Sequence, residues 1–533
     1  MRQAAQRRLS GLATIGILGL VLGACSAPTH HAALHRRGTL RLSLIGAPAT
    51  IDPLQVQDAS GTQIDELVYD GLVRVSPGLL PQSDLAKTWH ISRDGRTYTF
   101  QLNPRAKWQD GQPVTPQDVV FSFAAYRNPA DKSPAASLLG DVQSVAAIGK
   151  DAVRVRLEKP DAPFLLQVAT LPILPSHLLS RYTPGKALLS AVAPGDRTIG
   201  TGPFKITSAT ASRYTFTANK RYFLGAPHLR GLTLTVQQSP DSALMLLRRG
   251  KLDFAGVPLV DAAAVRTWPA VRLVRSFQLA FAGIVWNVSQ PPFNSPAMRR
   301  ALYFAVNRSQ IVSGPLYGYG AVANGPIPPV SWADDKSLAP RAYLPQRALQ
   351  LLAAAGWHET GNVLRDASGA PLRLDILAPS GAPLRTAALG LVARDLSAVG
   401  IEVTVHYEPF AQYTQDYISG NFQAAFAVRG LSADPDVSAY FGSPAVSNAG
   451  LNTGGYKDAQ VDSDLQKEMS LVDRGQRLTA LTGVQSAMQV DPPELFLYFP
   501  QSVDALSSRF AGFTPNPATT FYAPQNWSDR PLH

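Results

Sequence analysis

The chain has 533 residues, too many for one hydrophobic core, so we expect two or more domains. Apolar residues make up 45% of it and charged residues 16%, a balance that excludes an intrinsically disordered protein. The formal charge of +11 comes without a dense Lys/Arg run or an aromatic-interleaved basic stripe, which argues against nucleic-acid binding and for a basic, solvated surface.

The N-terminus has the pattern of a secretory signal. Three Arg precede the apolar run Gly11–Ala24, which is too short for a comfortable membrane span and ends in small residues. Leu22 to Cys25 resembles a bacterial lipobox, whose Cys is diacylated and becomes the new N-terminus. We predict a signal peptide over residues 1–24 and a lipidated tether over residues 25–37. Since Cys25 is the only cysteine, the mature fold has no internal disulfide.

Two alternating runs predict an early β-hairpin. In Thr97–Leu102 apolar and polar residues alternate with period two, as in a strand buried on one face. Trp89 and Ile91 repeat that spacing before Asp94-Gly95, a pair that can take the positive φ angles of a tight turn. Shortly afterwards, Thr115-Pro116 predicts the N-cap and first residue of a helix.

Further elements flank this hairpin. Leu40–Leu44 alternates as a strand, and residues 232–254 predict a β-α-β unit whose helix starts at Ser239 and whose two strands are parallel. The glycine-containing run Arg197–Ile206 lacks the spacing and the Lys-Ser/Thr ending of a P-loop, so it predicts no nucleotide site. Ser295 and Pro296 predict the start of another helix with one apolar face.

The second half of the chain alternates regularly between strands and helices. The strands are residues 372–377, 401–407 and 422–428, and the helices between them are residues 385–399 and 409–419. This alternation predicts a mostly parallel sheet covered by helices. Ligands of such sheets bind at loops beyond the carboxyl ends of the strands, and here one such loop is Arg429–Asp436.

Several segments, in order, resemble the bacterial extracellular solute-binding proteins of family 5, the peptide/nickel type. The longest match runs from Trp89 to Ser122. Shorter matches are Ala49–Pro53, Tyr69–Val73, Arg197–Ile206, Trp286–Val312, Asp434-Pro435-Asp436 and Pro492–Pro500.

The resemblance implies an α/β, two-lobed periplasmic-binding-protein fold of type II, similar to the large cluster C. Two crossings, near residues 277–286 and near Tyr498, would form a hinge. Lobe I would comprise residues 38–278 plus 498–533, with an inserted subdomain over about 54–195. Lobe II would comprise residues 279–497.

The resemblance also implies a function. The chain would be a monomeric substrate-binding lipoprotein of an ABC importer. It would capture a small solute, by default an oligopeptide or dipeptide, and deliver it to the permease and ATPase complex. Cys25 would hold it in the periplasm or on the outer face of the cytoplasmic membrane. No cofactor, metal site or nucleic-acid partner is implied.

Three alternatives remain open at this level. The same fold could bind a sugar, an opine-like compound or a metal chelate, or it could serve a signalling receptor. An exported hydrolase is the third alternative, although the sequence has no Gly-x-Ser-x-Gly, His-Glu-x-x-His or paired-Cys zinc motif. Peptide-binding members of the family hold the ligand amine with an Asp three residues before the Asp-Pro-Asp element. That position here is Leu431, which leaves room for a ligand without a free amine.

The predicted ligand-binding residues come from both lobes. Aromatic rings would line the cleft, Arg429 would meet a ligand carboxylate, and an Asp would meet an amine. The predicted set is Ala59, Ser60, Trp286, Asn287, Arg429, Gly430, Leu431, Asp434, Asp436 and Tyr498.

Overall fold

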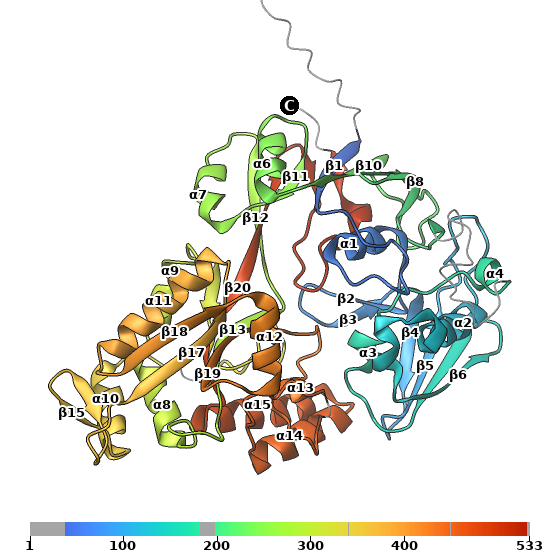
Figure 1. The fold of residues 1–533 in the computed structure, drawn as a ribbon. Helices are drawn as coiled ribbons and strands as arrows, with labels where there is room; N and C mark the ends of the chain where they lie inside the picture. The colour runs from blue at the N-terminus through green and yellow to red at the C-terminus, as the bar shows by residue number, and fades with distance from the viewer. Residues whose placement is uncertain (1–37, 182–197, 339–340, 448, 530–533) are drawn as a thin grey trace, which may run out of the picture. The chain divides into compact units, whose positions relative to one another are not determined.

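The computed structural model describes residues 38–181, 198–338, 341–447 and 449–529. Its mixed α/β fold is organised around a large sheet of twelve strands in the described part of the chain (Figure 1). The continuous order of this sheet is β18 (Glu402–Glu408), β17 (Arg373–Pro379), β19 (Ala424–Gly430), β13 (Ala280–Trp286), β20 (Glu494–Ser507), β11 (Phe254–Gly256), β1 (Thr39–Ile45), β10 (Gly231–Gln237), β9 (Arg213–Ala218) and β8 (Phe204–Thr210).

Strand β20 belongs to both lobes. Up to Pro500 it pairs with β13 and with β14 (Gly320–Val322), and from Gln501 it pairs with β11 and β12 (Val271–Phe277). The chain also passes from β12 to β13 through residues 277–280. We call residues 277–280 and 499–501 the hinge segments. They connect the strands of lobe I to those of lobe II, as a two-lobed fold with two crossings requires.

The lobe I part of the sheet confirms the predicted β-α-β unit. Both β10 and β11 run parallel to β1, which lies between them. The connecting helix α6 (Pro240–Arg248) has Ser239 as its N-cap, and the Ser239 hydroxyl accepts the N–H of Ser242. Apolar residues of β1, β10 and α1 (Ala59–Val68) form the core of this lobe.

A separate four-stranded sheet, β4 (Ala86–Ile91), β5 (Thr97–Leu102), β7 (Ala152–Leu157) and β6 (Val142–Ile148), carries the predicted hairpin. Strands β4 and β5 pair antiparallel around Gly95, which has φ 68°. Tyr98 and Phe100 face the core of this sheet, as the alternation predicts. Helix α2 (Pro116–Arg127) starts where predicted, and its Asp118 carboxylate accepts the N–H of the cap residue at 2.7 Å.

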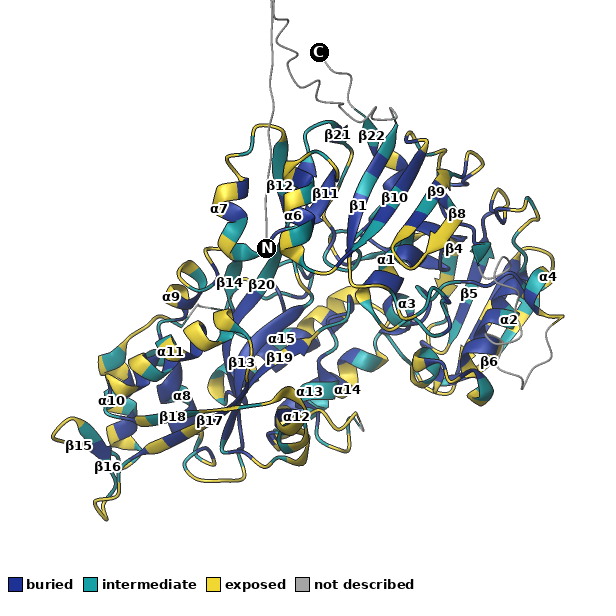
Figure 2. Cartoon of the chain, turned by 45° about the horizontal axis from the view of Figure 1, so that its top comes forward, coloured by how far each residue is buried: buried dark blue, intermediate teal, exposed yellow. Residues whose placement is uncertain are grey.

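The lobe II part of the sheet contains the three predicted parallel strands and continues beyond them with antiparallel pairs. Strands β17, β18 and β19 are parallel to one another, but β13 pairs antiparallel with β19 and with β20. This half of the sheet is therefore mixed. Strand β13 is buried along its whole length, as Figure 2 shows.

Helices cover the sheets, and the predicted helix after Ser295 is confirmed as α8, whose Met298, Ala301, Leu302 and Ala305 are all buried. Besides α1, α2 and α6, the α-helices of the described residues are α3 (Phe164–Gln167), α4 (Ser176–Leu179), α7 (Ala262–Val265), α8 (Pro296–Ala305), α9 (Arg308–Ser313), α10 (Pro345–Ala354), α11 (Pro383–Ser397), α12 (Phe410–Ser419), α13 (Ser438–Phe441), α14 (Ala459–Ser470) and α15 (Arg474–Val490). Two-stranded pairs complete the fold: β2 (Val73–Val75) with β3 (Pro81–Ser83), β15 (His358–Thr360) with β16 (Val363–Arg365), and β21 (Phe510–Ala511) with β22 (Ser528–Asp529).

The predicted signal peptide, Cys25 and the tether lie outside the described residues. Within the ranges that the structure describes, no helix combines the length and the apolar character needed to cross a membrane.

Candidate functional site

One row of side chains crosses the sheet of lobe II beside the hinge segments. Ala282 of β13 pairs with Val428 on one side and with Tyr498 on the other. Paired residues project on the same face of a sheet, so Val428 and Tyr498 flank the small Ala282. Tyr498 is buried, whereas Val428 is 55% exposed. Because these residues lie where β19 ends and β20 crosses to lobe I, we call them the hinge row.

Arg385, at the start of α11, lies on the same face as the hinge row. Its guanidinium is 5.8 Å from the ring centre of Phe426, which precedes Val428 by two residues on β19. The guanidinium donates to the backbone carbonyl of Pro379, at the carboxyl end of β17. In the described part of the chain its hydrogen-bond acceptors are backbone carbonyls, and it makes no ion pair. Arg385 is not among the ligand-binding residues predicted from the sequence, although the start of a helix after a parallel strand was a signal for it.

Burial raises the pKa of the Tyr498 hydroxyl to about 12, and the positive charge of Arg385 opposes that rise. The hydroxyl therefore stays protonated at neutral pH and can donate a hydrogen bond. A cation and a hydroxyl donor on one face form an arrangement suited to an anionic group.

Arg429, by contrast, faces the other side of the sheet. It pairs with Phe281 of β13, and its guanidinium stacks 4.7 Å from the ring centre of Tyr440. Its Nε lies 3.5 Å from Oε1 of Glu494, and both side chains are almost completely buried. Burial raises the pKa of Glu494 to about 6, and the charge of Arg429 opposes the rise. The Arg429 side chain is thus engaged in an internal ion pair.

The Asp434-Pro435-Asp436 loop is also held in place by internal hydrogen bonds of the protein. Arg477 of α15 donates two hydrogen bonds to Asp434, at 2.7 and 3.0 Å, and two to Glu468, at 2.6 and 2.9 Å. All three side chains are buried. Burial raises the pKa of Glu468 to about 8, although Arg477 opposes the shift. The Asp434 carboxylate therefore fixes the loop to α14 and α15.

The other predicted loop residues lie close by. Asp436 accepts the backbone N–H of Ser438 at 2.8 Å and so begins α13, and burial raises the pKa of its carboxyl. The Leu431 N–H donates to the carbonyl of Leu279 in the first hinge segment, at 2.7 Å. Gly430 is exposed and pairs with Ala280.

This loop contacts lobe I. Ala433 packs with Val75, Leu79 and Leu166 in one apolar cluster, and the amide of Gln167 donates to the hydroxyl of Ser432 at 3.4 Å. A cavity lined by Leu79, Leu431 and Asp434 has a volume of about 10 Å³. That space holds about one water molecule, so a larger solute would need this contact to open.

The remaining predicted residues lie elsewhere. Trp286 and Asn287 are at the far end of β13, about 20 Å from Ala280 at the usual rise per residue. Trp286 is fully buried and stacks on Phe293, while the Asn287 amide donates to the carbonyls of Gly420 and Phe422. The structure does not bring these two residues together with the hinge row.

Ala59 and Ser60 begin α1 in lobe I, after the carboxyl end of β1. Ala59 is exposed. The Ser60 hydroxyl lies within hydrogen-bonding distance of the carbonyls of Ile45 and Gly46, at 3.2 and 3.0 Å, so it closes the loop that follows β1.

Comparison with known proteins gives a consistent result. The family model for bacterial extracellular solute-binding proteins, family 5 middle region, matches residues 81–452. The oligopeptide-binding protein AppA of Bacillus subtilis is 27% identical over 531 residues, covering 97% of each chain. Di/tripeptide-binding protein 2 of Pseudomonas aeruginosa is 28% identical over 514 residues, covering 90% of this chain and 93% of that protein.

Solved structures agree in fold. NikZ from Campylobacter jejuni, in complex with Ni(L-His), superposes with a TM-score of 0.73 at 25% identity, covering 92% of this chain and 100% of that one. AppA from Bacillus subtilis, in complex with a nonapeptide, gives a TM-score of 0.71 at 27% identity, covering 92% and 99%.

The two-lobed fold and its hinge define a substrate-binding component of an ABC importer, which binds its solute without chemical conversion. The chain belongs to the bacterial extracellular solute-binding proteins, family 5, so the resemblance seen in the sequence is confirmed. Members of this family are extracellular or periplasmic binding proteins. The exported hydrolase is thereby excluded.

Proposed function

We propose that this chain is a lipid-anchored, monomeric receptor that closes lobes I and II around a short peptide or peptide-like solute carrying a carboxylate. The position of Arg385 is the observation that carries the proposal. Its half-buried guanidinium lies on the face of the hinge row and is bonded only to backbone carbonyls in the described part of the chain. A ligand carboxylate would accept a charge-assisted bidentate pair from it.

The proposed site offers less to the amine of a ligand than Arg385 offers to its carboxylate. Leu431 provides no charge, and the Asp434 carboxylate is already bonded to Arg477. We infer that the solute is held through its carboxylate and its apolar groups more than through a free amine. The peptide names of the relatives and the nonapeptide complex of AppA support a peptide class.

A metal chelate is the second candidate, because NikZ is described with Ni(L-His). Over the described ranges no group of three His, Cys, Asp or Glu side chains is arranged to hold a metal ion. A chelate that supplies its own metal ligands fits this chain better than a bare ion. Sugars, opine-like compounds and a signalling role are further outcomes of the tests below.

We propose the lobe boundaries and subdomain given by the sequence: lobe I at residues 38–278 plus 498–533, its subdomain at about 54–195, and lobe II at 279–497. The change of partners along β20 between Pro500 and Gln501 supports the second crossing, three residues beyond the boundary expected from the sequence.

The ligand test uses the full chain purified in detergent. Native mass spectrometry would identify the solute that co-purifies, and calorimetry would measure its affinity. We expect Arg385→Ala to weaken binding of a carboxylate-bearing solute roughly 10- to 100-fold, the loss typical of one charge-assisted pair. Arg347→Ala is the matched control, because it removes an exposed arginine of α10 that is not among the proposed binding residues, and it should bind within about threefold of wild type. Unchanged affinity in Arg385→Ala would contradict the site.

The anchor is tested separately. Cys25→Ser should move the protein from the membrane fraction to the soluble fraction and remove the diacylglycerol mass from the N-terminus. Membrane retention of the Ser variant would contradict lipidation. Co-purification with a permease would separate transport from signalling.

A further inference from the structure

A cavity with a volume of about 380 Å³ lies inside lobe I, away from the hinge row. Its walls come from α1, from residues 170–172 and from residues 518–525. This volume falls within the range of small-molecule sites. None of the predicted ligand-binding residues lines it, and the proposed function leaves it without a role.

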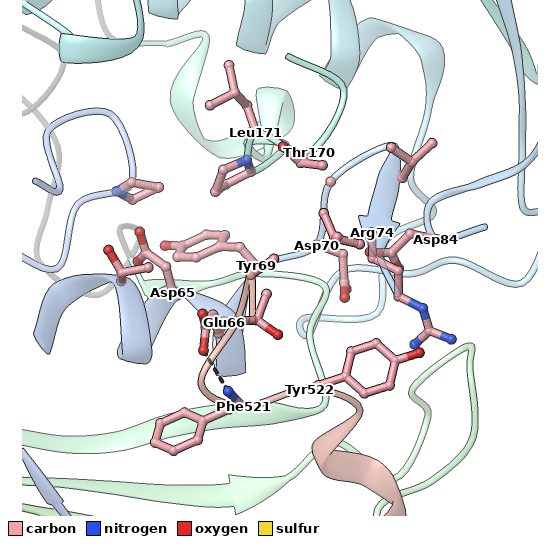
Figure 3. A pocket seen from close by; sticks show the side chains of 18 of the residues that line it. Asp65, Glu66, Tyr69, Asp70, Arg74, Asp84, Thr170, Leu171, Phe521 and Tyr522 are labelled. Carbon is pink, nitrogen blue, oxygen red and sulfur yellow. Dashed lines mark hydrogen bonds between the residues drawn. The ribbon is translucent and has the colours of Figure 1, made fainter. Parts of the chain in front are cut away.

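Four of the polar side chains that line this cavity are acidic. Figure 3 shows Asp65 and Glu66 on one side of Tyr69, and Asp70, Asp84 and Arg74 on the other. Arg74 is the single cation among the described lining residues. Its guanidinium lies 5.6 Å from the ring centre of Tyr522.

Two of these carboxylates have protein partners. Glu66 accepts the N–H groups of Thr520 and Phe521, at 3.2 and 2.9 Å. Asp70 accepts the hydroxyls of Thr201 and Tyr222, at 2.7 and 2.9 Å. They tie α1 and the loop after it to neighbouring segments, which is a structural role.

Asp65 and Asp84 differ from these two. Asp65 is 8% exposed and Asp84 is 4% exposed, and Oδ1 of each is buried without a hydrogen-bond partner in the described structure. A buried, unpartnered carboxylate oxygen is costly, so such groups are expected to meet a donor or a cation. The positive charge of Arg74 opposes the rise in the pKa of Asp84. The charges that affect the pKa of Asp65 belong to Asp52, Asp58 and Glu66, which are all acids.

We propose that this cavity is a second binding site, for a small organic cation whose ammonium group meets Asp65 and whose apolar body lies among the aromatic and aliphatic lining. An ammonium group has three N–H donors, and one of them can bond to the unpartnered Oδ1 atom of Asp65. Phe521 and Tyr522 contribute to the apolar lining, where the Phe521 ring packs against Phe254 and Trp527 and Arg74 lies over the ring of Tyr522. A metal ion is a poorer fit, since the described residues contain no three-ligand cluster.

Burial raises the pKa of Asp65, and its acidic neighbours raise it further, so an occupying cation would also stabilise the charged carboxylate. The site is independent of the proposed transport function, because its lining excludes Arg385 and the hinge row.

Three probes of similar shape test the proposal on the full chain in detergent: phenethylammonium, 2-phenylethanol and phenylacetate. By calorimetry at pH 7.5 we expect phenethylammonium to bind at least about tenfold more tightly than the other two, the scale of one charge-assisted contact. Equal binding of the three probes would overturn the proposal. This comparison needs no variant and so does not depend on the folding of a mutant.

Single-residue variants then test where the cation binds. Asp65→Asn keeps the side-chain shape and should abolish the preference for phenethylammonium, while Glu359→Gln, at an exposed position on β15, should retain it. Arg385→Ala should also retain the preference. Loss of the preference in Arg385→Ala, or its persistence in Asp65→Asn, would overturn the assignment to lobe I. Each outcome is independent of whether a peptide binds at the hinge row.

Discussion

At the scale of single residues, two neighbouring positions on β19 show an unusual pattern of burial: the apolar side chain is exposed and the charged side chain is buried. Val428 is 55% exposed, whereas Arg429 is 4% exposed and lies beside Glu494. A sequence pattern would place the charged residue in solvent and the apolar one inside. The reversal arises because Glu494 reaches Arg429 from a distant strand. Gly283 makes room for it, since a Cβ there would lie 2.9 Å from the carboxylate.

This ion pair gives a prediction about stability. Glu494→Gln removes the charge that compensates the buried Arg429, so the free energy of unfolding should fall by about 3 kcal/mol, as for other broken buried pairs. Urea unfolding followed by circular dichroism measures the change. Ligand affinity of the folded variant should stay near that of wild type. A large loss of affinity with unchanged stability would instead indicate that Arg429 serves the ligand.

At the scale of elements, the glycine-rich turn before β8 has a packing role. Gly202 donates its N–H to the carbonyl of Val68 at 2.8 Å, and the Gly200 carbonyl accepts the N–H of Gln109 at 2.9 Å. A Cβ at Gly200 would lie 1.9 Å from the Val68 oxygen. The turn therefore links the end of α1 to the segment around Gln109, which explains its glycines without a phosphate.

Gly200→Ala should destabilise the protein by about 1–3 kcal/mol or more, because the clash is with backbone and cannot relax by a rotamer change. Gly390→Ala is the control. It lies within α11 with open space around its Cβ position, so it should stabilise the fold by about 0.5–1 kcal/mol. Melting temperatures of the two variants should shift in opposite directions. Equal shifts would contradict this account of the turn.

Local signals predicted the local elements well. The hairpin around Gly95, the start of α2 and the apolar stripe of α8 each depend on residues close in sequence, and all three are confirmed. The regular alternation after Leu372 correctly predicted that β17, β18 and β19 are parallel. It could not predict the antiparallel pairing of β13 with β19, because that pairing joins segments far apart in the chain. Arg385 was missed for the same reason, since only the pairing of β19, β13 and β20 brings Val428 and Tyr498 to its face.

At the scale of the whole molecule, buried acids set the pH dependence of stability. Burial raises the pKa of Glu66 to about 7, of Asp161 to about 6 and of Asp504 to about 7. The folded protein thus keeps protons that the unfolded chain has released. These groups penalise folding progressively as pH rises from their unfolded values, near 4, to their folded values.

We therefore expect the free energy of unfolding to be higher at pH 5 than at pH 8. Asp504→Asn should make that slope shallower and raise stability at pH 8 by about 1–3 kcal/mol, since it removes one such carboxyl. Glu359→Gln, at an exposed position, should leave the slope unchanged. Denaturant titrations at several pH values measure the slope. A flat profile from pH 5 to pH 8 would contradict the prediction.

The place of β20 in the chain has a consequence for truncated forms of the protein. Strands β13, β14, β11 and β12 all pair with residues 494–507, which follow all four of these strands in the chain. Without residues 494–507 the strands on both sides of β20 keep unpaired edges, so neither part of the large sheet is complete. A chain that stops before Glu494 would lack the strand with which both parts of the large sheet pair.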